Sequence, residues 1–193
     1  MSVILKQDLR ESSTMAFVKV TFEEVERELR RRNFGILATV SKEGRVYSTG
    51  VLYAVSPAKD PFQLYVITRS GNRKVRNIKE NPNVSFVVPL PRRVLTFVPP
   101  ACIQFQGTAE IVDAKDQAAV RAYRSSYFLR MILRVEDDIV RRQGGEACFI
   151  RIRPDPVVFT YLLGLPLWEF RKRAAYAGAK VKIPPERMQV RSA

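Results

Sequence analysis

The sequence contains no histidine among its 193 residues. This absence excludes Ser-His-Asp and Cys-His catalytic arrangements, imidazole metal ligands and the side chain that most often changes charge near neutral pH. If the protein is an enzyme, another group or a cofactor must therefore carry the chemistry.

Cysteine is also scarce, because only Cys102 and Cys148 are present. Two cysteines this far apart form neither a CxxC metal knuckle nor the disulfide framework of a small secreted protein. A single disulfide between them is left open. Otherwise we expect both to behave as small buried hydrophobic residues.

Long hydrophobic runs are missing. A membrane-spanning helix needs about 20 apolar residues, and the best candidate, Tyr161 to Trp168, is short and interrupted by Gly164 and Pro166. The segment Met1 to Ser13 carries charged residues with no apolar stretch behind them, which argues against a secretory signal. We therefore predict a cytoplasmic protein without a membrane span.

Negative charge is in short supply, since 33 Lys and Arg against 19 Asp and Glu leave a net charge of +14. Two explanations of this excess are an anionic partner, and solubility combined with Arg-rich surface pairing at high temperature. Aromatic residues are only weakly interleaved with the basic ones, so nucleic acid is not the partner that we expect. A phosphorylated cofactor would use only a few of these cations.

What the chain does have is an ordinary globular composition, 46% hydrophobic and 27% charged. Its length favours one domain over residues 1–193, with an N-terminal arm at 1–20 and a basic C-terminal arm at 169–193.

Periodicity predicts a mainly β (α+β) fold. Thr21 and Glu24 have capping-box spacing, and a turn at Ser41 to Arg45 joins the first two strands into a hairpin. The predicted helices are Phe22–Arg32, Asn72–Glu80 and Lys115–Leu133, and the predicted strands are Phe34–Val40, Val46–Val55, Phe62–Thr68, Val84–Val88, Cys102–Val112, Ala147–Ile152 and Val157–Tyr161. The proline-rich stretch Pro89 to Pro100 is expected to be an irregular loop. Such an order suits a small antiparallel β-barrel with flanking helices.

The most informative segment is Thr68 to Lys74, which joins a predicted buried strand to the first turn of a helix. Ser70 or Asn72 can cap the helix, whose first N–H groups and positive dipole end favour an anion. Thr68 would add a hydroxyl, and Arg73 and Lys74 two cations. These are the parts of a phosphate cradle, although a plain helix cap beside a solvated basic face fits the same spacing.

Family resemblance favours the cradle. The chain resembles the pyridoxamine 5′-phosphate oxidase-related, FMN-binding split-barrel superfamily from about Thr21 to Asp113. The residues that carry the likeness are Phe34-Gly35-Ile36-Leu37-Ala38-Thr39-Val40, Val51-Leu52-Tyr53, Leu64-Tyr65-Val66-Ile67-Thr68, Asn72-Arg73-Lys74-Val75-Arg76-Asn77-Ile78 and Asn81-Pro82-Asn83-Val84.

The resemblance implies a homodimer of six-stranded antiparallel split barrels that holds two FMN molecules at the subunit interface. It implies that Thr68, Arg73 and Lys74 bind the FMN phosphate, with Asn72 where the family has a serine. It also implies that the backbone of Thr49, Gly50, Val51 and Leu52 lies along the flavin ring. Gly50 stands where true pyridoxamine phosphate oxidases have an arginine, so a vitamin B6 substrate is not what we expect.

Other candidate residues are weaker. By resemblance, Gln104 or Gln106 would reach the flavin of the partner chain, but both also suit a solvated strand face. Trp168, Phe170 and Arg171 could cover a ring and an anionic group, or simply anchor the chain by packing. Glu136, Asp137 and Asp138 are interpreted as a helix N-terminus rather than as metal ligands, so no metal is predicted.

Three functions stay open on the sequence. The first is an FMN-dependent oxidoreductase acting on a small-molecule substrate, in which the cofactor carries the chemistry. The second keeps the fold but binds a deazaflavin, whose acidic tail would use the positive charge. The third is a non-enzymatic protein that binds flavin, haem or nucleic acid.

Overall fold

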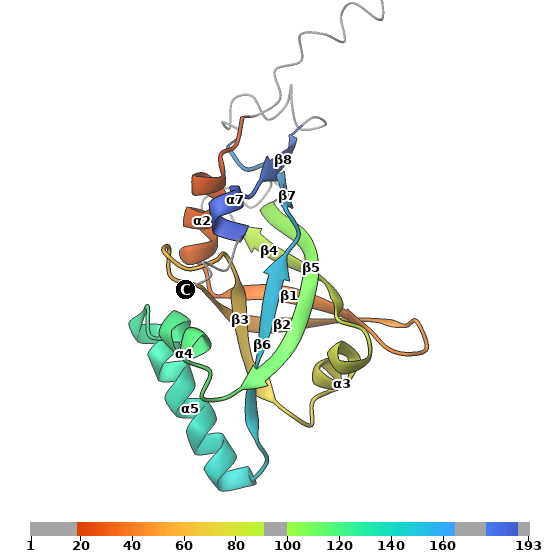
Figure 1. The fold of residues 1–193 in the computed structure, drawn as a ribbon, viewed down its shortest axis with the longest axis vertical. Coiled ribbons are helices and arrows are strands. Elements are labelled where there is room, and N and C mark those ends of the chain that lie inside the picture. Colours follow the sequence, from red (N-terminus) through yellow and green to blue (C-terminus); the bar gives the residue numbers. More distant parts are fainter. Residues whose placement is uncertain (1–18, 91–99, 165–176, 189–193) are drawn as a thin grey trace, which may run out of the picture.

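The computed structural model describes residues 19–90, 100–164 and 177–188. Strands dominate it (Figure 1). The helices are α2 (Phe22–Arg30), α3 (Arg73–Glu80), α4 (Gln117–Tyr123), α5 (Tyr127–Gln143) and α7 (Pro185–Met188), and the strands are β1 (Phe34–Val40), β2 (Val46–Val55), β3 (Leu64–Arg69), β4 (Asn83–Leu90), β5 (Ala101–Asp113), β6 (Ala147–Pro154), β7 (Val157–Tyr161) and β8 (Gly178–Lys182).

Six of the strands close into a barrel. The sheet runs in the order β4-β1-β2-β3-β6-β5-β7-β8, and an additional pairing between β4 and β5 joins its two ends. Every pairing is antiparallel. The predicted six-stranded antiparallel barrel with flanking helices is therefore confirmed, and closure leaves the barrel strands without a free edge at the β4–β5 seam.

The hairpin of β1 and β2 has the bounds that the sequence predicts. Ser41 N–H donates to Arg45 O at 2.9 Å, and Gly44 turns the chain with a φ of +78°. Because Gly44 has no Cβ, this left-handed conformation costs it little. The local turn chemistry thus decides where both strands end.

Strands β7 and β8 extend the barrel beyond β5. Gln104 of β5 lies opposite Phe159 of β7, and Phe159 lies opposite Lys180 of β8. The short strand β8 and the helix α7 belong to the predicted C-terminal arm and were not predicted as regular elements. Residues 169–176 and 189–193 of that arm, which include Phe170 and Arg171, lie outside the described residues. Trp168 and residues 1–18 of the N-terminal arm lie outside them as well.

The helices pack on different parts of the barrel. The predicted capping box of α2 is confirmed, because Thr21 Oγ1 accepts from Glu24 N at 3.3 Å and Glu24 Oε2 accepts from Thr21 N at 2.9 Å. Arg187 of α7 forms an ion pair with Glu26 of α2 at 2.9 Å. Figure 1 shows these two helices together near β7 and β8, with α3 and α5 near the opposite end of the barrel.

The predicted helix Lys115–Leu133 is wrong in detail. The structure has two helices, α4 and α5, separated at Arg124–Ser126, because the side chain of Ser126 accepts from Leu129 N and begins a new helix. Helix α5 then continues to Gln143. Glu136, Asp137 and Asp138 consequently lie within α5 and not at a helix N-terminus, which corrects the sequence interpretation.

The two cysteines do not form a disulfide. Cys102 lies opposite Tyr161 near the start of β5, whereas Cys148 lies opposite Asp113 at its other end. Eleven residues of extended strand separate these positions by roughly 35 Å. Cys148 is buried as expected, but Cys102 is only partly buried.

Candidate phosphate cradle and the open edge of strand β2

The turn between β3 and α3 contains the predicted cradle. Thr68 is buried near the end of β3, and Asn72 immediately precedes the helix. The side chain of Asn72 does not cap α3 as predicted, because its Nδ2 donates to Thr68 Oγ1 at 2.9 Å. The turn is therefore held from within, and the start of the helix is left without a side-chain cap.

This uncapped helix start presents backbone donors. The carbonyl of the residue just before α3, Asn72 O, accepts from Val75 N at 3.0 Å and Arg76 N at 3.3 Å. The amides of Arg73 and Lys74 are in the first turn of α3, where backbone N–H groups have no acceptor within the helix. Two N–H groups and the positive end of the helix dipole are thus available to an anion at this turn.

Two cations lie beside these amides. The guanidinium of Arg73 stacks over the ring of Tyr47 at 4.7 Å from its centroid. Lys74 is only partly exposed, and burial lowers the pKa of its ammonium, while the nearby Cys148 and Glu136 act in the opposite direction. An incoming phosphate would supply the negative charge that burial makes favourable here.

The surroundings of Lys74 include residues that sequence reasoning missed. Cys148 of β6 lies directly opposite Thr68, and burial raises the pKa of its thiol. Glu136 of α5 forms an ion pair with Arg69 at 3.4 Å. Helix α5 thus borders the cradle. The sequence could not show this, because it depends on how α5 packs on β6.

The second part of the site is the outer half of β2. Strand β1 pairs with β2 from Val46 to Leu52. In the described chain, β3 pairs with β2 only at Tyr53, Ala54 and Val55. Beyond that point the β3 side of β2 is open, so alternate backbone groups of Thr49 to Leu52 have no strand partner there.

A tyrosine hydroxyl lies at the point where the pairing of β2 with β3 ends. Tyr123 of α4 donates from Oη to Leu52 O at 3.1 Å and accepts from Ile67 N at 2.9 Å. It is fully buried, and burial raises its pKa. Tyr123 therefore replaces one strand-to-strand contact with a side-chain bridge and keeps the two strands apart.

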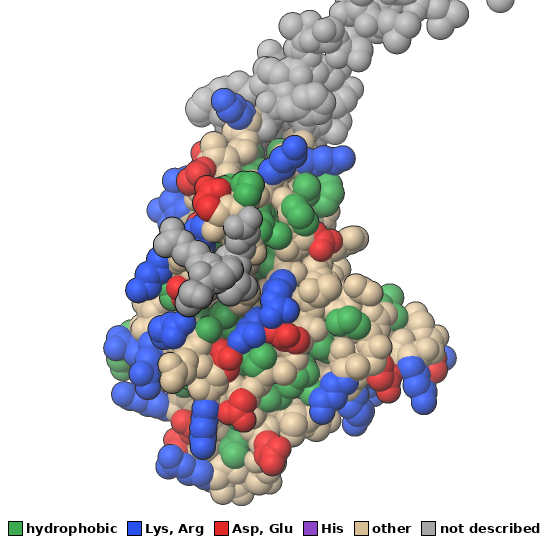
Figure 2. Space-filling view, in the orientation of Figure 1, with side chains coloured by type: hydrophobic (Ala, Val, Ile, Leu, Met, Phe, Trp, Pro, Cys, Tyr) green, Lys and Arg blue, Asp and Glu red, His purple; other side chains and the backbone are tan. Residues whose placement is uncertain are grey.

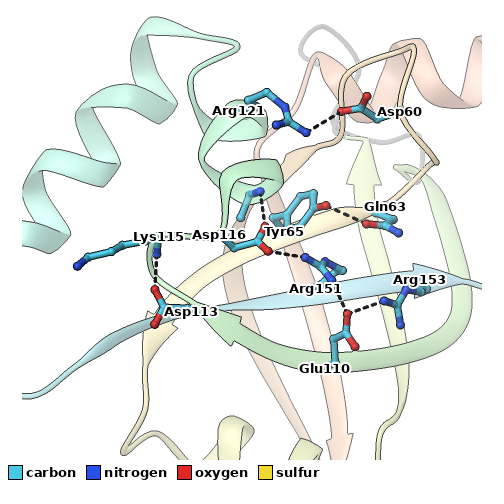
Figure 3. A network of polar contacts seen from close by, with 11 residues as sticks. Asp60, Gln63, Tyr65, Glu110, Asp113, Lys115, Asp116, Arg121, Arg151 and Arg153 are labelled. Carbon is cyan, nitrogen blue, oxygen red and sulfur yellow. Dashed lines mark hydrogen bonds and ion pairs between the residues drawn. The ribbon is translucent and has the colours of Figure 1, made fainter. Parts of the chain in front are cut away.

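Helix α4 is itself anchored by an ionic network (Figure 3). Asp116 accepts from Ala119 N at the start of α4 through Oδ1 and from Arg151 through Oδ2, at 2.9 and 2.6 Å. Arg151 also pairs with Glu110 at 2.7 Å. Because Arg151 is on β6 and Glu110 on β5, the network ties α4, and with it Tyr123, to the barrel wall.

The comparisons with known proteins agree with this fold. The family model described as pyridoxamine 5′-phosphate oxidase matches residues 21–160. The chain belongs to this family. The resemblance drawn from the sequence is thereby confirmed, whereas a search of curated protein sequences found no match.

Several solved structures share the fold of this chain at low sequence identity. A conserved hypothetical protein from Mycobacterium tuberculosis is 21% identical with a TM-score of 0.56, and the alignment covers 78% of this chain and 92% of that one. HutZ, the haem storage protein from Vibrio cholerae, is 17% identical with a TM-score of 0.55, over 71% and 92%. A pyridoxamine 5′-phosphate oxidase-related, FMN-binding protein from Nostoc punctiforme is 14% identical with a TM-score of 0.54, over 85% and 96%.

Within one chain, the site residues predicted from the sequence fall into two groups. Thr68, Asn72, Arg73 and Lys74 come together at one turn, and the outer half of β2 approaches them through the contact of Tyr47 with Arg73. Gln104 lies elsewhere, exposed on β5 beside β7, and Gln106 is exposed on the same strand. Any role of Gln104 at a flavin would need the cradle of a second chain.

Metal binding finds no support in the described ranges. They hold no group of three or more His, Cys, Asp or Glu side chains arranged for a metal ion. No helix in this part of the chain has the length and apolarity to cross a membrane.

Proposed function

We propose that this protein is an FMN-dependent oxidoreductase of the pyridoxamine 5′-phosphate oxidase-like type. The observation that carries the proposal is the turn at Thr68 to Lys74, where Asn72 bonds to Thr68 and leaves the start of α3 uncapped beside two cations. A buried hydroxyl, two free amides and two positive side chains fit a phosphate monoester better than a neutral ligand.

Each residue has a distinct part in this proposal. Thr68 and Asn72 offer hydrogen bonds to phosphate oxygens, while Arg73 and Lys74 neutralise the charge. Leu52 O already accepts from Tyr123, but the open backbone edge along Thr49, Gly50, Val51 and Leu52 offers its remaining alternate donors and acceptors to the polar rim of a flat ring. FMN supplies electron or hydride transfer when bound, so no histidine is required for a small-molecule substrate to react.

We also propose a homodimer with two flavin sites at its interface. Large apolar side chains are exposed on β1 and β2, with Phe34 at 49%, Ile36 at 36% and Val46 at 67%. A second copy would remove these side chains from water. In such a dimer Gln104 would belong to the flavin site of the other chain.

Reconstitution with FMN tests the proposal. The protein dialysed after incubation with FMN should keep flavin absorbance, and Arg73→Ala should weaken FMN binding about 10- to 100-fold. Arg76→Ala is the matched control, because Arg76 is an exposed arginine of the same helix, one turn further on. A colourless protein with no FMN-dependent thermal shift would contradict the proposal.

The alternatives predict other outcomes of the same titration. Tighter binding of a deazaflavin than of FMN would favour the deazaflavin-dependent reductase. Bound flavin that no donor reduces would favour a non-enzymatic carrier. Nucleic-acid binding with a steep salt dependence, in the absence of any cofactor, would favour the nucleic-acid-binding protein.

Haem is a second candidate ligand because HutZ, which shares the fold, is a haem storage protein. This chain has no histidine, so the iron would need a different axial ligand, such as a cysteine or tyrosine side chain. We therefore place FMN first. A Soret band that appears on haemin addition and survives dialysis would reverse that order.

We further propose that the protein works in the cytoplasm. Its two cysteines are free: Cys102 lies near the start of β5, and Cys148 of β6 lies beside the other end of β5. An oxidising compartment would therefore add no disulfide between these two cysteines to stabilise the fold. Cell fractionation with a tagged chain tests the location.

A further inference from the structure

Helix α5 is long but only lightly covered by the rest of the described chain. Of its 17 residues, that part of the chain fully buries only Leu129. Figure 1 shows the helix on the outside of the barrel, next to β6. In the same view, Figure 2 shows acidic, basic and hydrophobic side chains close together over this helix. One long face of α5 is therefore open to another molecule.

Apolar side chains form a row on this open face. Tyr127, Met131 and Val135 follow one another at intervals of four residues, which places them on one side of the helix. Tyr127 is 76% exposed, Met131 42% and Val135 45%, and Phe128 beside them is 38% exposed. Single exposed apolar residues are common, whereas a contiguous group of large ones is typical of a contact surface.

The two ends of this row carry opposite charges. Asp138 follows Met131 by seven residues, so it continues the row toward the C-terminal end of α5, and its side chain is 60% exposed. Its ion pair with Arg141 is long, at 4.0 Å, and therefore weak. At the other end the exposed Arg124 comes three residues before α5 begins. The row thus runs from a cation, through apolar side chains, to an anion.

This order of charges is complementary to a second copy of the same row in the reverse direction. In a pair related by a two-fold axis at Met131, residues equally far from the axis on either side meet. Tyr127 would then lie against the partner's Val135. The same axis would place Asp138 against the partner's Arg124.

Other partners fit the row less well. An amphipathic helix that binds an anionic membrane combines its apolar residues with Lys and Arg, and a nucleic acid is likewise recognised by cations. Asp138 lies in the row itself and would be repelled by either surface. The charges therefore favour a second copy of this chain.

We propose that the exposed row of α5 is a self-association surface, at which two chains meet with their α5 helices antiparallel. The surface is distinct from the proposed flavin dimer, which uses Phe34, Ile36 and Val46 of β1 and β2. The contact through α5 therefore joins flavin dimers into larger assemblies. It is small beside a standard interface, which buries about 800 Å² on each partner, so we expect a dissociation constant on the order of 10–100 μM.

Sedimentation equilibrium of the full chain, at concentrations below and above that constant, tests the proposal. The mean mass should rise with concentration. Met131→Glu sets two negative charges against each other at the two-fold axis and should weaken this association at least tenfold, or by about 1.4 kcal/mol. Val46→Glu is the matched control, because it places the same charge on an exposed apolar position of β2. It should weaken the flavin dimer and leave the association through α5 unchanged.

A charge exchange makes the test specific for the antiparallel pair. Asp138→Arg and Arg124→Asp should each weaken the association about three- to fivefold, because each sets like charges against one another. The double variant, which carries both substitutions, should restore it. Asp137→Arg is the control, because Asp137 is exposed on the same helix but lies outside the row. Thermal melts of each variant identify any loss that comes from unfolding.

Three results would overturn the proposal. One is a mass that rises with concentration to the same extent in Met131→Glu as in the unaltered protein. Another is an equal effect of Asp138→Arg and Asp137→Arg. The third is a double variant that associates no more tightly than its two single variants. An unaltered protein that passes only from monomer to a dimer sensitive to Met131→Glu would support the α5 contact and contradict the proposed flavin dimer, so the two failures are distinguishable.

Discussion

The two halves of β2 have the same backbone conformation but different surroundings. The inner half, Tyr53 to Val55, is buried and pairs with β3. The outer half, Val46 to Leu52, pairs with β1 and is largely exposed from Val46 to Gly50. Tyr123 stands at the boundary through its bond to Leu52 O. The difference indicates that the inner half supports the barrel and that the outer half is available for a ligand.

The largest effect is expected when one tyrosine in each half of β2 is replaced by alanine. Tyr53 is fully buried and donates to Leu29 O at 2.9 Å, so Tyr53→Ala should lower the free energy of unfolding by about 3–5 kcal/mol. Tyr47 is half-buried and contacts Arg73, so Tyr47→Ala should cost about 1 kcal/mol or less. Urea unfolding measures both, and equal costs would show that the halves are not distinct.

The boundary itself is tested by Tyr123→Phe. Removing the hydroxyl leaves Leu52 O and Ile67 N without their shared partner, which should cost about 1–3 kcal/mol. Amide exchange at Ile67 should become faster, and FMN binding should weaken if the β2 edge shifts. Tyr65→Phe is the control, because the hydroxyl of Tyr65 donates to the half-buried side chain of Gln63. A similar loss in both variants would contradict a special role for the boundary.

A pH titration sharpens the comparison on the ligand side. Burial lowers the pKa of Lys74, and a bound phosphate would raise it again. FMN affinity should therefore be highest below the lowered pKa of Lys74 and should fall as pH rises through that pKa. In Lys74→Met, FMN affinity should be about tenfold weaker at pH 7 and should lack this pH-dependent fall. Lys79→Met is the control on the same helix, and a wild-type profile identical to that of Lys74→Met would refute the assignment.

The lowered pKa of Lys74 has a different consequence for the stability of the protein without ligand. The folded pKa of Lys74 lies below its unfolded value, so the charged ammonium destabilises the fold at pH below the folded pKa. This penalty disappears as pH rises from the folded toward the unfolded pKa. Lys74→Met should accordingly raise the melting temperature at pH 7 while it weakens FMN binding.

The smallest expected effect on stability is that of Gly50→Ala. A Cβ at Gly50 would meet the ring of Phe34 at 3.0 Å, and Phe34 is 49% exposed and can turn away. The free energy of unfolding should change by about 0.5 kcal/mol at most. FMN affinity should nevertheless fall, because the new methyl group stands on the open strand that is proposed to contact the ring. Unaltered affinity would remove Gly50 from the site.

Local signals explain which elements could be predicted. The hairpin of β1 and β2 was predicted with its observed bounds because alternating residues and a turn around Gly44 suffice to define it. The break between α4 and α5 was missed although Ser126 is a standard helix cap, because the apolar spacing continues across it. Strand β8 was missed because its five residues alternate too briefly for a periodic signal.

The candidate site divides in the same way. Thr68, Asn72, Arg73 and Lys74 are close in sequence, so a strand followed by a helix brings them together without further information. Tyr123 is 71 residues from Leu52, and on its helix it has the spacing of an ordinary core residue. Only packing of α4 on the barrel gives its hydroxyl two backbone partners.

The sequence by itself determined the family, the run of strands and the cluster of groups at the β3–α3 turn, because these depend on short-range patterns. Tertiary structure alone decided that β4 and β5 close the barrel, that the β3 side of β2 is open from Val46 to Leu52, and that Gln104 lies opposite Phe159 of β7. These features depend on register between distant strands, which is set by burial of one strand face against the shared core.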